Sequence, residues 1–149
     1  MRTRNMTLAF ASCALLAFAA VGSAAESTAI KANVPFEFQI DDQVFPAGQY
    51  VVTYPISPVR NLILLSTPEG RALRMIFTHG FDARAWDSRT YLVFNAYGNQ
   101  YFLSRIWSGA LGSGRELRRS AEERNLRELL GHSAQGTKGM KVVHLAAAH

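Results

Sequence analysis

One histidine and two aspartates are the residues of this chain best placed to do acid–base chemistry. His79 precedes Asp82 and Asp87 in a stretch that ends a predicted strand and enters a loop. An imidazole oriented by a carboxylate is a common general base, so a small periplasmic hydrolase or isomerase using His79 with Asp82 or Asp87 is the alternative function. The favoured interpretation is structural, with His79 covering the core at the end of its strand. The other histidines belong to the predicted C-terminal tail: His132, His144 and His149.

An aromatic and basic trio suggests binding instead of catalysis. Tyr101, Arg105 and Trp107 recur at even spacing, which places them on one face of a strand. Rings beside an arginine can stack on a sugar or receive an extended peptide. The simpler interpretation is that the rings belong to the core of a domain without disulfides. These three residues are the candidate binding residues.

Motifs for known catalytic and metal chemistry are missing from the sequence. It contains no P-loop, no G-x-S-x-G, no HExxH, and no paired histidines or cysteines at metal-ligand spacing. Gly112-Ser113-Gly114 resembles a nucleophile turn only superficially, since helix capping accounts for Ser113. We therefore predict no catalytic residue, no metal and no cofactor.

The N-terminus has the organisation of an export signal. Two early arginines precede an apolar run from Leu8 to Val21, and the small residues 22–25 follow. A run of this length is short for a bilayer, which takes roughly 20 residues to cross. We expect cleavage after Ala25, a mature chain that starts at Glu26, and a periplasmic or extracellular location without stable membrane insertion.

Export changes the meaning of the cysteine and of the charge. Cys13 is the only cysteine, and it would leave with the signal, so the mature protein could form no disulfide. A lipoprotein signal fits poorly because the apolar run continues past Cys13. The chain has 16 basic and 11 acidic residues, and loss of Arg2 and Arg4 brings the basic residues down to 14. This small excess does not indicate a nucleic-acid partner.

Alternating hydrophobicity predicts a mainly β domain over residues 26–112. From Ile30 to Asp41 apolar and polar residues alternate, which is typical of a strand with one buried face. Pro35 cannot donate to a ladder, so this is expected to be an edge strand. Five further strands are predicted: Gln49–Ile56, Leu62–Leu65, Arg71–His79, Thr90–Ala96 and Gln100–Trp107. Short turns without intervening helices favour an antiparallel meander forming a small sandwich or barrel.

The C-terminal region is predicted to hold one helix and a flexible tail. Ser113 and Glu116 match a capping box, so the helix is placed at residues 113–131, packed on the hairpin whose second apolar face needs a cover. The arginines and glutamates of this helix are spaced for exposed ion pairs and are interpreted as a solvated face: Arg119–Glu123, Glu123–Arg127 and Arg124–Glu128. Residues 132–149 are expected to be flexible, apart from a chance strand at Val142-Val143.

Several short segments resemble a family of small exported bacterial proteins of unknown function that is common in soil bacteria. The resemblance extends from Val34 to Leu126 and rests on Val34-Pro35-Phe36-Glu37-Phe38, Phe45-Pro46-Ala47-Gly48-Gln49-Tyr50, Tyr97-Gly98-Asn99-Gln100-Tyr101-Phe102-Leu103-Ser104, Gly114-Arg115-Glu116-Leu117 and Ala121-Glu122-Glu123-Arg124. It implies a shared fold and brings no catalytic residues. The expected function is therefore an exported, non-enzymatic β-domain that binds or supports an envelope protein or glycan.

Overall fold

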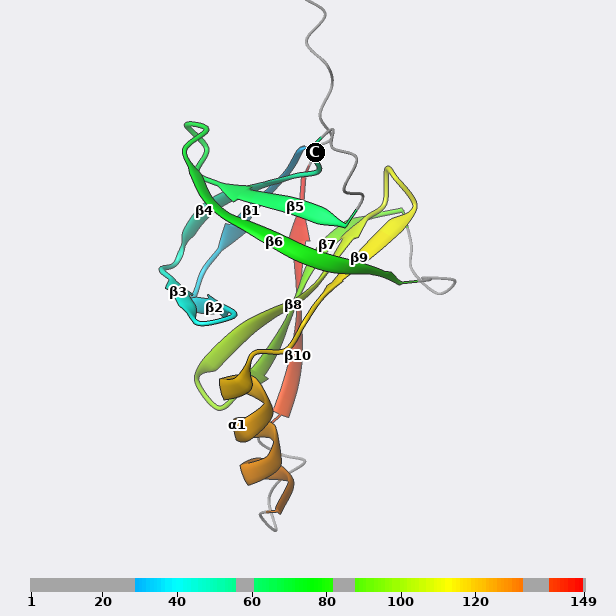
Figure 1. Ribbon diagram of the computed structural model, residues 1–149. Coiled ribbons are helices and arrows are strands. Elements are labelled where there is room, and N and C mark those ends of the chain that lie inside the picture. The colour runs from blue at the N-terminus through cyan, green and yellow to red at the C-terminus, as the bar shows by residue number, and fades with distance from the viewer. Residues whose placement is uncertain (1–28, 56–60, 82–87, 133–139, 149) are drawn as a thin grey trace, which may run out of the picture.

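The computed structural model describes residues 29–55, 61–81, 88–132 and 140–148 (Figure 1). The predicted signal, Cys13, Asp82 and Asp87 lie outside these residues. The described chain forms one helix, α1 (Ala121–His132). Its strands are β1 Ala29–Val34, β2 Phe38–Ile40, β3 Gln43–Phe45, β4 Gly48–Thr53, β5 Leu62–Ser66, β6 Ala72–Phe81, β7 Thr90–Tyr97, β8 Gln100–Ser108, β9 Ser113–Leu117 and β10 Met140–Ala147.

The strands form two packed layers, so the predicted fold class, mainly β with one C-terminal helix, is confirmed. One layer contains β1, β4, β5 and the first half of β6; the other contains the second half of β6 with β9, β8, β7 and β10. The long strand β6 crosses between the layers (Figure 1). A single bridge, Lys31 with Ala148, joins β1 to the chain just after β10, and the sheet is not closed into a barrel. The arrangement is a small sandwich.

The core lies between the layers and is capped by the β2–β3 hairpin. Phe38 stacks on Phe45 at 5.4 Å between ring centroids and meets Tyr50 and Phe94 edge-on. The apolar side chains that share this interior come from both layers and include Ile30, Val52, Ile63, Leu65, Ile76, Leu92, Leu103, Ile106 and Leu117. The alternation that begins at Ile30 therefore marks an inside and an outside, as predicted.

The first predicted strand is divided in two. Its residues alternate as expected, but β1 pairs with β4 whereas β2 pairs with β3 and touches β8 at one position. Pro35 lies in the break, where its missing N–H costs no ladder hydrogen bond. The proline thus ends a strand instead of weakening one.

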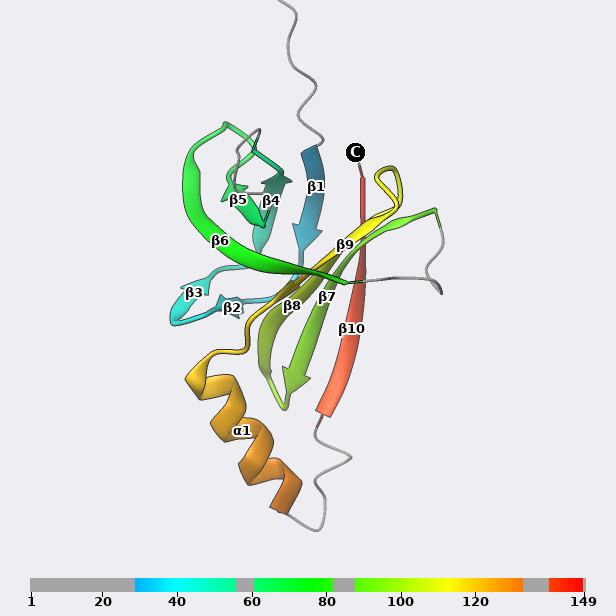
Figure 2. The ribbon, with the colours of Figure 1, turned by 45° about the vertical axis from the view of Figure 1, so that its right-hand side comes forward.

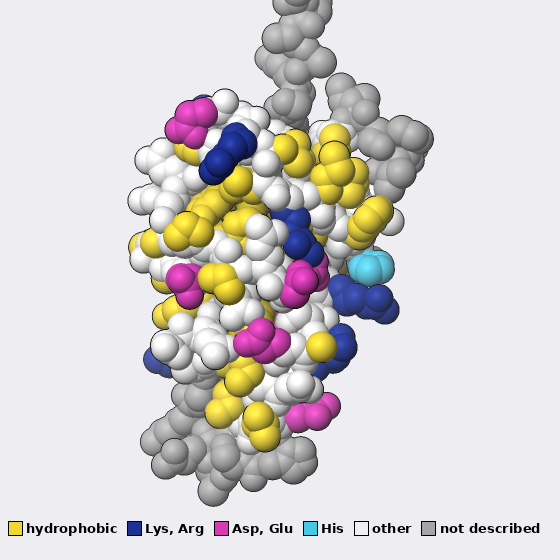
Figure 3. Space-filling model, turned by 60° about the vertical axis from the view of Figure 1, so that its left-hand side comes forward, with side chains coloured by type: hydrophobic (Ala, Val, Ile, Leu, Met, Phe, Trp, Pro, Cys, Tyr) yellow, Lys and Arg dark blue, Asp and Glu magenta, His cyan; other side chains and the backbone are white. Residues whose placement is uncertain are grey.

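Strand β5 and the first half of β6 are covered on one face only, although the continuous apolar run Leu62–Leu65 predicts a central strand covered on both faces. Leu62 and Leu64 are half-buried, so β5 is not enclosed on both faces. Their cross-strand partners on β6 are Phe77 and Met75, which are 71% and 64% exposed. The face of β6 that carries His79 therefore points outward, and hydrophobic side chains are visible on the molecular surface in Figure 3.

A bulge in the β7–β8 hairpin changes the register that a two-residue loop at Gly98-Asn99 predicts, with Phe94 opposite Leu103 and Leu92 opposite Arg105. The two-residue loop holds, with Tyr97 paired to Gln100 and Gly98 at a φ of 64°. Phe94 pairs with Leu103 as predicted, but Val93 pairs with Arg105, which leaves Ser104 without a partner in the ladder. One extra residue reverses the side-chain alternation beyond it.

The helix begins at Ala121, eight residues later than predicted. Residues 113–117 form strand β9, which pairs with β6 and β8. The N-cap is Ser120, whose Oγ accepts a hydrogen bond of 3.0 Å from the backbone N–H of Glu123. Gly114 of β9 pairs with Phe81 of β6, and a Cβ at this position would overlap the Phe81 ring, so the close approach requires a glycine. Strand β9, not α1, lies beside β8.

The expectation of a flexible tail is wrong for residues 140–148. Strand β10 pairs antiparallel with β7 from Met140 opposite Tyr97 to Ala147 opposite Thr90. Val143 and Leu145 pack against the core. Without β10, the outer edge of β7 would expose unpaired N–H and C=O groups. Strand β10 satisfies them.

Candidate functional site

His79 lies on the surface and does not cover the core. It is exposed near the end of β6, and its cross-strand partner on β9 is Glu116. Both line a shallow hollow of about 440 Å³ together with Arg118, Arg119, Arg124 and Arg127. The two aspartates that would complete a catalytic pair lie outside the described residues, so that pairing stays a prediction.

The bulge at Ser104 separates the aromatic and basic trio. Tyr101 packs against the core and stacks on Phe36, with 4.0 Å between ring centroids. Arg105 and Trp107 lie on the opposite face of β8, beside Phe81 at 5.6 Å and 6.2 Å. The three side chains therefore do not form one binding surface, and the expectation that they share a strand face is wrong.

Arg105 instead belongs to a cleft between the helix and the second layer. The cleft has a volume of about 380 Å³ and is bounded by α1, β7, β8 and the start of β10. Figures 1 and 2 show α1 below the β7–β8 hairpin, at the end of the molecule where β10 begins. The polar side chains that line the cleft are Asn95, Tyr97, Arg105, Arg119, Arg127 and Lys141. We call it the arginine-lined cleft.

A buried carboxylate organises the wall of this cleft. Glu123, on the first turn of α1, is only 3% exposed. Its Oε1 accepts hydrogen bonds from Nδ2 of Asn95 at 2.7 Å and from the hydroxyl of Tyr97 at 3.1 Å. Nε of Arg119 lies 3.6 Å from the same oxygen. These contacts satisfy a charge that would be costly to bury alone, and they attach α1 to β7.

Burial and the neighbouring Glu123 carboxylate both raise the pKa of Tyr97. Desolvation is the larger cause, and the anionic acceptor adds to it because a phenolate beside a carboxylate is repelled. The Tyr97 hydroxyl therefore stays protonated at neutral pH and keeps donating to Glu123. The network is fixed in one donor–acceptor arrangement.

The cleft carries excess positive charge. Arg105 is engaged by Glu116, with its Nε and Nη2 atoms 3.3 and 3.2 Å from Oε1. Within the described part of the chain, no salt bridge neutralises Arg127 or Lys141. Arg127 and Lys141 are both exposed. Like charges on a surface repel one another modestly, and an anion in the cleft would relieve that repulsion. The electrostatics favour an anionic ligand.

Replacing Glu123 by alanine is expected to destabilise the protein by about 2–4 kcal/mol. The change strands the buried hydroxyl of Tyr97 and the partly buried amide of Asn95, and an unsatisfied buried group costs about 1–3 kcal/mol. Chemical denaturation monitored by circular dichroism measures the loss. The control is Glu122→Ala, an exposed neighbour on the same helical turn, which should stay within about 0.5 kcal/mol. Equal effects at the two positions would mean that Glu123 is not buried.

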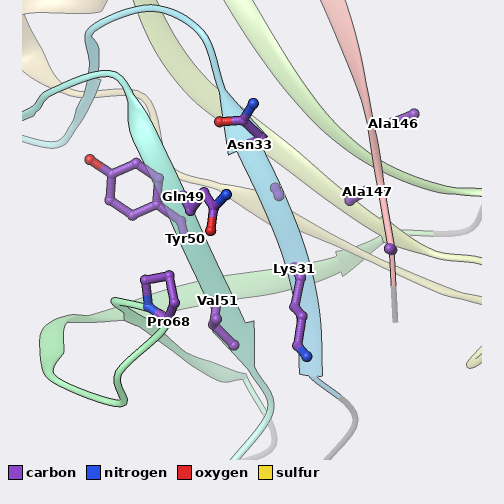
Figure 4. A pocket seen from close by; sticks show the side chains of 10 residues that line it. Lys31, Asn33, Gln49, Tyr50, Val51, Pro68, Ala146 and Ala147 are labelled. Carbon is purple, nitrogen blue, oxygen red and sulfur yellow. The ribbon is translucent and has the colours of Figure 1, made fainter.

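A larger hollow of about 680 Å³ lies where β1 and β4 approach the end of β10 (Figure 4). Lys31 and Asn33 of β1 and Gln49 and Val51 of β4 line it, with alanines of β10 opposite. Its side chains carry a single charge and no buried polar network. It offers little basis for selecting a ligand, and the arginine-lined cleft is therefore the better candidate despite its smaller volume.

The described residues show neither a metal cluster nor a membrane-spanning helix. No three His, Cys, Asp or Glu side chains gather within residues 29–55, 61–81, 88–132 and 140–148 to hold a metal ion. Across the same ranges, no helix is long and apolar enough to cross a membrane.

Comparisons with protein families, curated proteins and solved structures found no match to this chain. The function therefore has to be argued from the arginine-lined cleft itself.

The sequence contains a signal for this cleft. Arg119, Glu123 and Arg127 follow one another at i, i+4 spacing, a pattern that predicts exposed ion pairs on a solvated helix face. The structure buries the middle residue of the three and leaves the outer two at the cleft. A second Ser-x-x-Glu motif, Ser120 to Glu123, marks the true helix start and could have placed Glu123 in the first turn.

Proposed function

We propose that this protein is an exported, non-enzymatic β-domain that binds an anionic ligand of the cell envelope in the arginine-lined cleft. The observation that carries the proposal is that Glu123 binds some of the polar side chains of the cleft and leaves two of its cations without a salt bridge. Its buried carboxylate holds Asn95, Tyr97 and Arg119 in place, while Arg127 and Lys141 keep their charge. A preorganised wall with unneutralised cations is what an anion-binding site requires.

The lining of the cleft favours a ligand with a carbon body and an acidic group. Guanidinium groups recognise carboxylates and phosphates through paired N–H donors. Val142, which is 59% exposed, adds apolar surface to the same cleft beside the buried side chains of Val93 and Ala96. A sugar acid combines an apolar ring face with a carboxylate, so it matches both parts of the lining. This agrees with an envelope glycan as the partner.

Binding fits the cleft better than catalysis does. Glu123, the carboxylate closest to the cleft wall, already accepts two hydrogen bonds and is buried, so it has little freedom to act as a base. Guanidinium, amide and phenol groups bind and orient a ligand at neutral pH. The alternative enzyme would work at His79, in the neighbouring hollow, with aspartates that the structure does not describe.

Export is part of the proposal and rests on the sequence. The charged start, the short apolar run and the small residues up to Ala25 support secretion. An anionic envelope polymer would be accessible to a protein in that location.

Calorimetric titration with galacturonate is the test of the proposal. Galacturonate should bind, and neutral galactose should not, because only the first carries a carboxylate. Arg127→Gln should weaken galacturonate binding by about tenfold, which is a loss of about 1.4 kcal/mol. Arg71→Gln is the matched control, since Arg71 is an exposed arginine on the distant β5–β6 turn. Equal affinity for both sugars, or equal effects of the two variants, would contradict an anion site in this cleft.

A further inference from the structure

The arginine-lined cleft continues into a second hollow, and two arginines belong to both. Arg119 and Arg127 line the cleft and also line the hollow of about 440 Å³ that contains His79. The cleft extends from these arginines towards Lys141 on β10, and the hollow extends from them towards Arg118 and the end of β6. The two depressions therefore adjoin at these arginines, and we call them together the track.

The track concentrates positive charge. Two carboxylates line or underlie it, and both are occupied: Glu116 pairs with Arg105, and Glu123 holds Asn95 and Tyr97. Six cationic side chains line it in total: Arg105, Arg118, Arg119, Arg124, Arg127 and Lys141. A single small anion in the cleft would leave Arg118 and Arg124, in the hollow, without a ligand.

We infer that the ligand is a linear polyanion, an acidic polysaccharide, of which one acidic group occupies the cleft while another lies in the hollow beside Arg118. This inference rests on the proposed function and names its ligand class. Successive acidic sugars would place carboxylates along the track, with Arg119 and Arg127 between the two ends. Binding of a polyanion to several cations releases condensed counterions, so affinity should fall steeply with salt.

The shape and lining of the track distinguish this ligand from other polyanions. Its concave hollows suit a chain better than the flat surface of a lipid bilayer. Single-stranded nucleic acid is held by bases stacked on exposed aromatic rings. The aromatic side chain of the described track is Tyr97, which is 6% exposed and hydrogen-bonded to Glu123, so it offers no stacking platform.

The experiment compares galacturonate with a longer oligogalacturonate on the same purified protein. The oligomer should bind more tightly by about tenfold or better, because its second acidic group engages a linked site at high effective concentration. Its affinity should also depend more strongly on salt. Lys141→Gln, in the cleft, should weaken both ligands. Arg118→Gln, in the hollow, should weaken the oligomer and leave the monomer unchanged, and Arg71→Gln should change neither.

Three outcomes would overturn the inference. The first is equal affinity for monomer and oligomer, which would confine binding to the cleft and leave the proposed function intact. The second is an oligomer affinity that Arg118→Gln does not alter. The third is tight binding to vesicles of anionic phosphatidylglycerol with no binding of the oligomer, which would replace a glycan by a lipid surface. Failure of both sugars to bind would contradict the proposed function as well.

Discussion

Deleting residues 140–149 is expected to lower the melting temperature sharply and to make the protein prone to aggregation. Strand β10 pairs with β7 along the full length of that strand, and its removal leaves an unpaired edge beside an apolar surface. The deletion also takes Val143 and Leu145 from the core boundary. Burial of such side chains contributes about 1.5–3 kcal/mol each when complete, so a loss of about 2–4 kcal/mol is expected for these half-buried residues together.

A matched pair of substitutions tests whether the loss of stability comes from the packing of β10 and not from shortening the chain. Val143→Asp places a charge on the inward face of β10, whereas Val142→Asp places it on the outward face, where Val142 is 59% exposed. Thermal denaturation should show a large loss for the first and a small change for the second. An unchanged melting temperature after the deletion would mean that residues 140–148 do not form a strand of the domain.

Replacing Phe38 by alanine is expected to destabilise the protein by about 3–5 kcal/mol, the range for buried phenylalanines. Phe38 is 2% exposed and contacts Phe45, Tyr50 and Phe94 through their rings. It joins the β2–β3 hairpin to both layers, so the cavity left behind lies where three parts of the fold meet. Urea denaturation measures the change.

Glu37→Ala is the control for this substitution. Glu37 precedes Phe38 and is exposed, so its removal should change stability by less than about 0.5 kcal/mol. Comparable losses at the two positions would show that the alternation from Ile30 onward does not separate an interior face from a solvent face.

The strands could be predicted because their signal is local. Apolar residues at every second position identify a strand with one wet face whatever its partner, and this pattern located most of the sheet. The partners could not be predicted in the same way. Pro35 separates two strands, and the bulge at Ser104 reverses the side-chain alternation in one half of β8. Neither feature follows from the local pattern, because both depend on which strands lie alongside.

The helix start and the strand β10 could not be predicted for a related reason. Ser113 to Glu116 and Ser120 to Glu123 are equally good capping motifs, and only the available edges of β6 and β8 make a strand of the first. Strand β10 has a weak pattern of its own, with alanines at one end. Its stability comes from the open edge of β7, which lies far away in the sequence.

The arginine-lined cleft could not be predicted because four elements build it. Arg127 comes from α1, Arg119 from the segment just before it, Arg105 from β8 and Lys141 from β10. A correct β10 is needed to bring Lys141 there. The sequence did identify Arg105 as a binding candidate. It grouped that residue with Tyr101 and Trp107, whereas the bulge places it beside other cations.

The measurement that tests the anion site most directly is a titration of isotope-labelled protein with galacturonate, followed by nuclear magnetic resonance. Signals from Asn95, Tyr97, Arg119, Arg127 and Lys141 should shift together and saturate with one affinity, while those of the hollow near Lys31 and Gln49 should stay in place. Shifts confined to other surfaces, or none at saturating galacturonate, would contradict the arginine-lined cleft as the binding site.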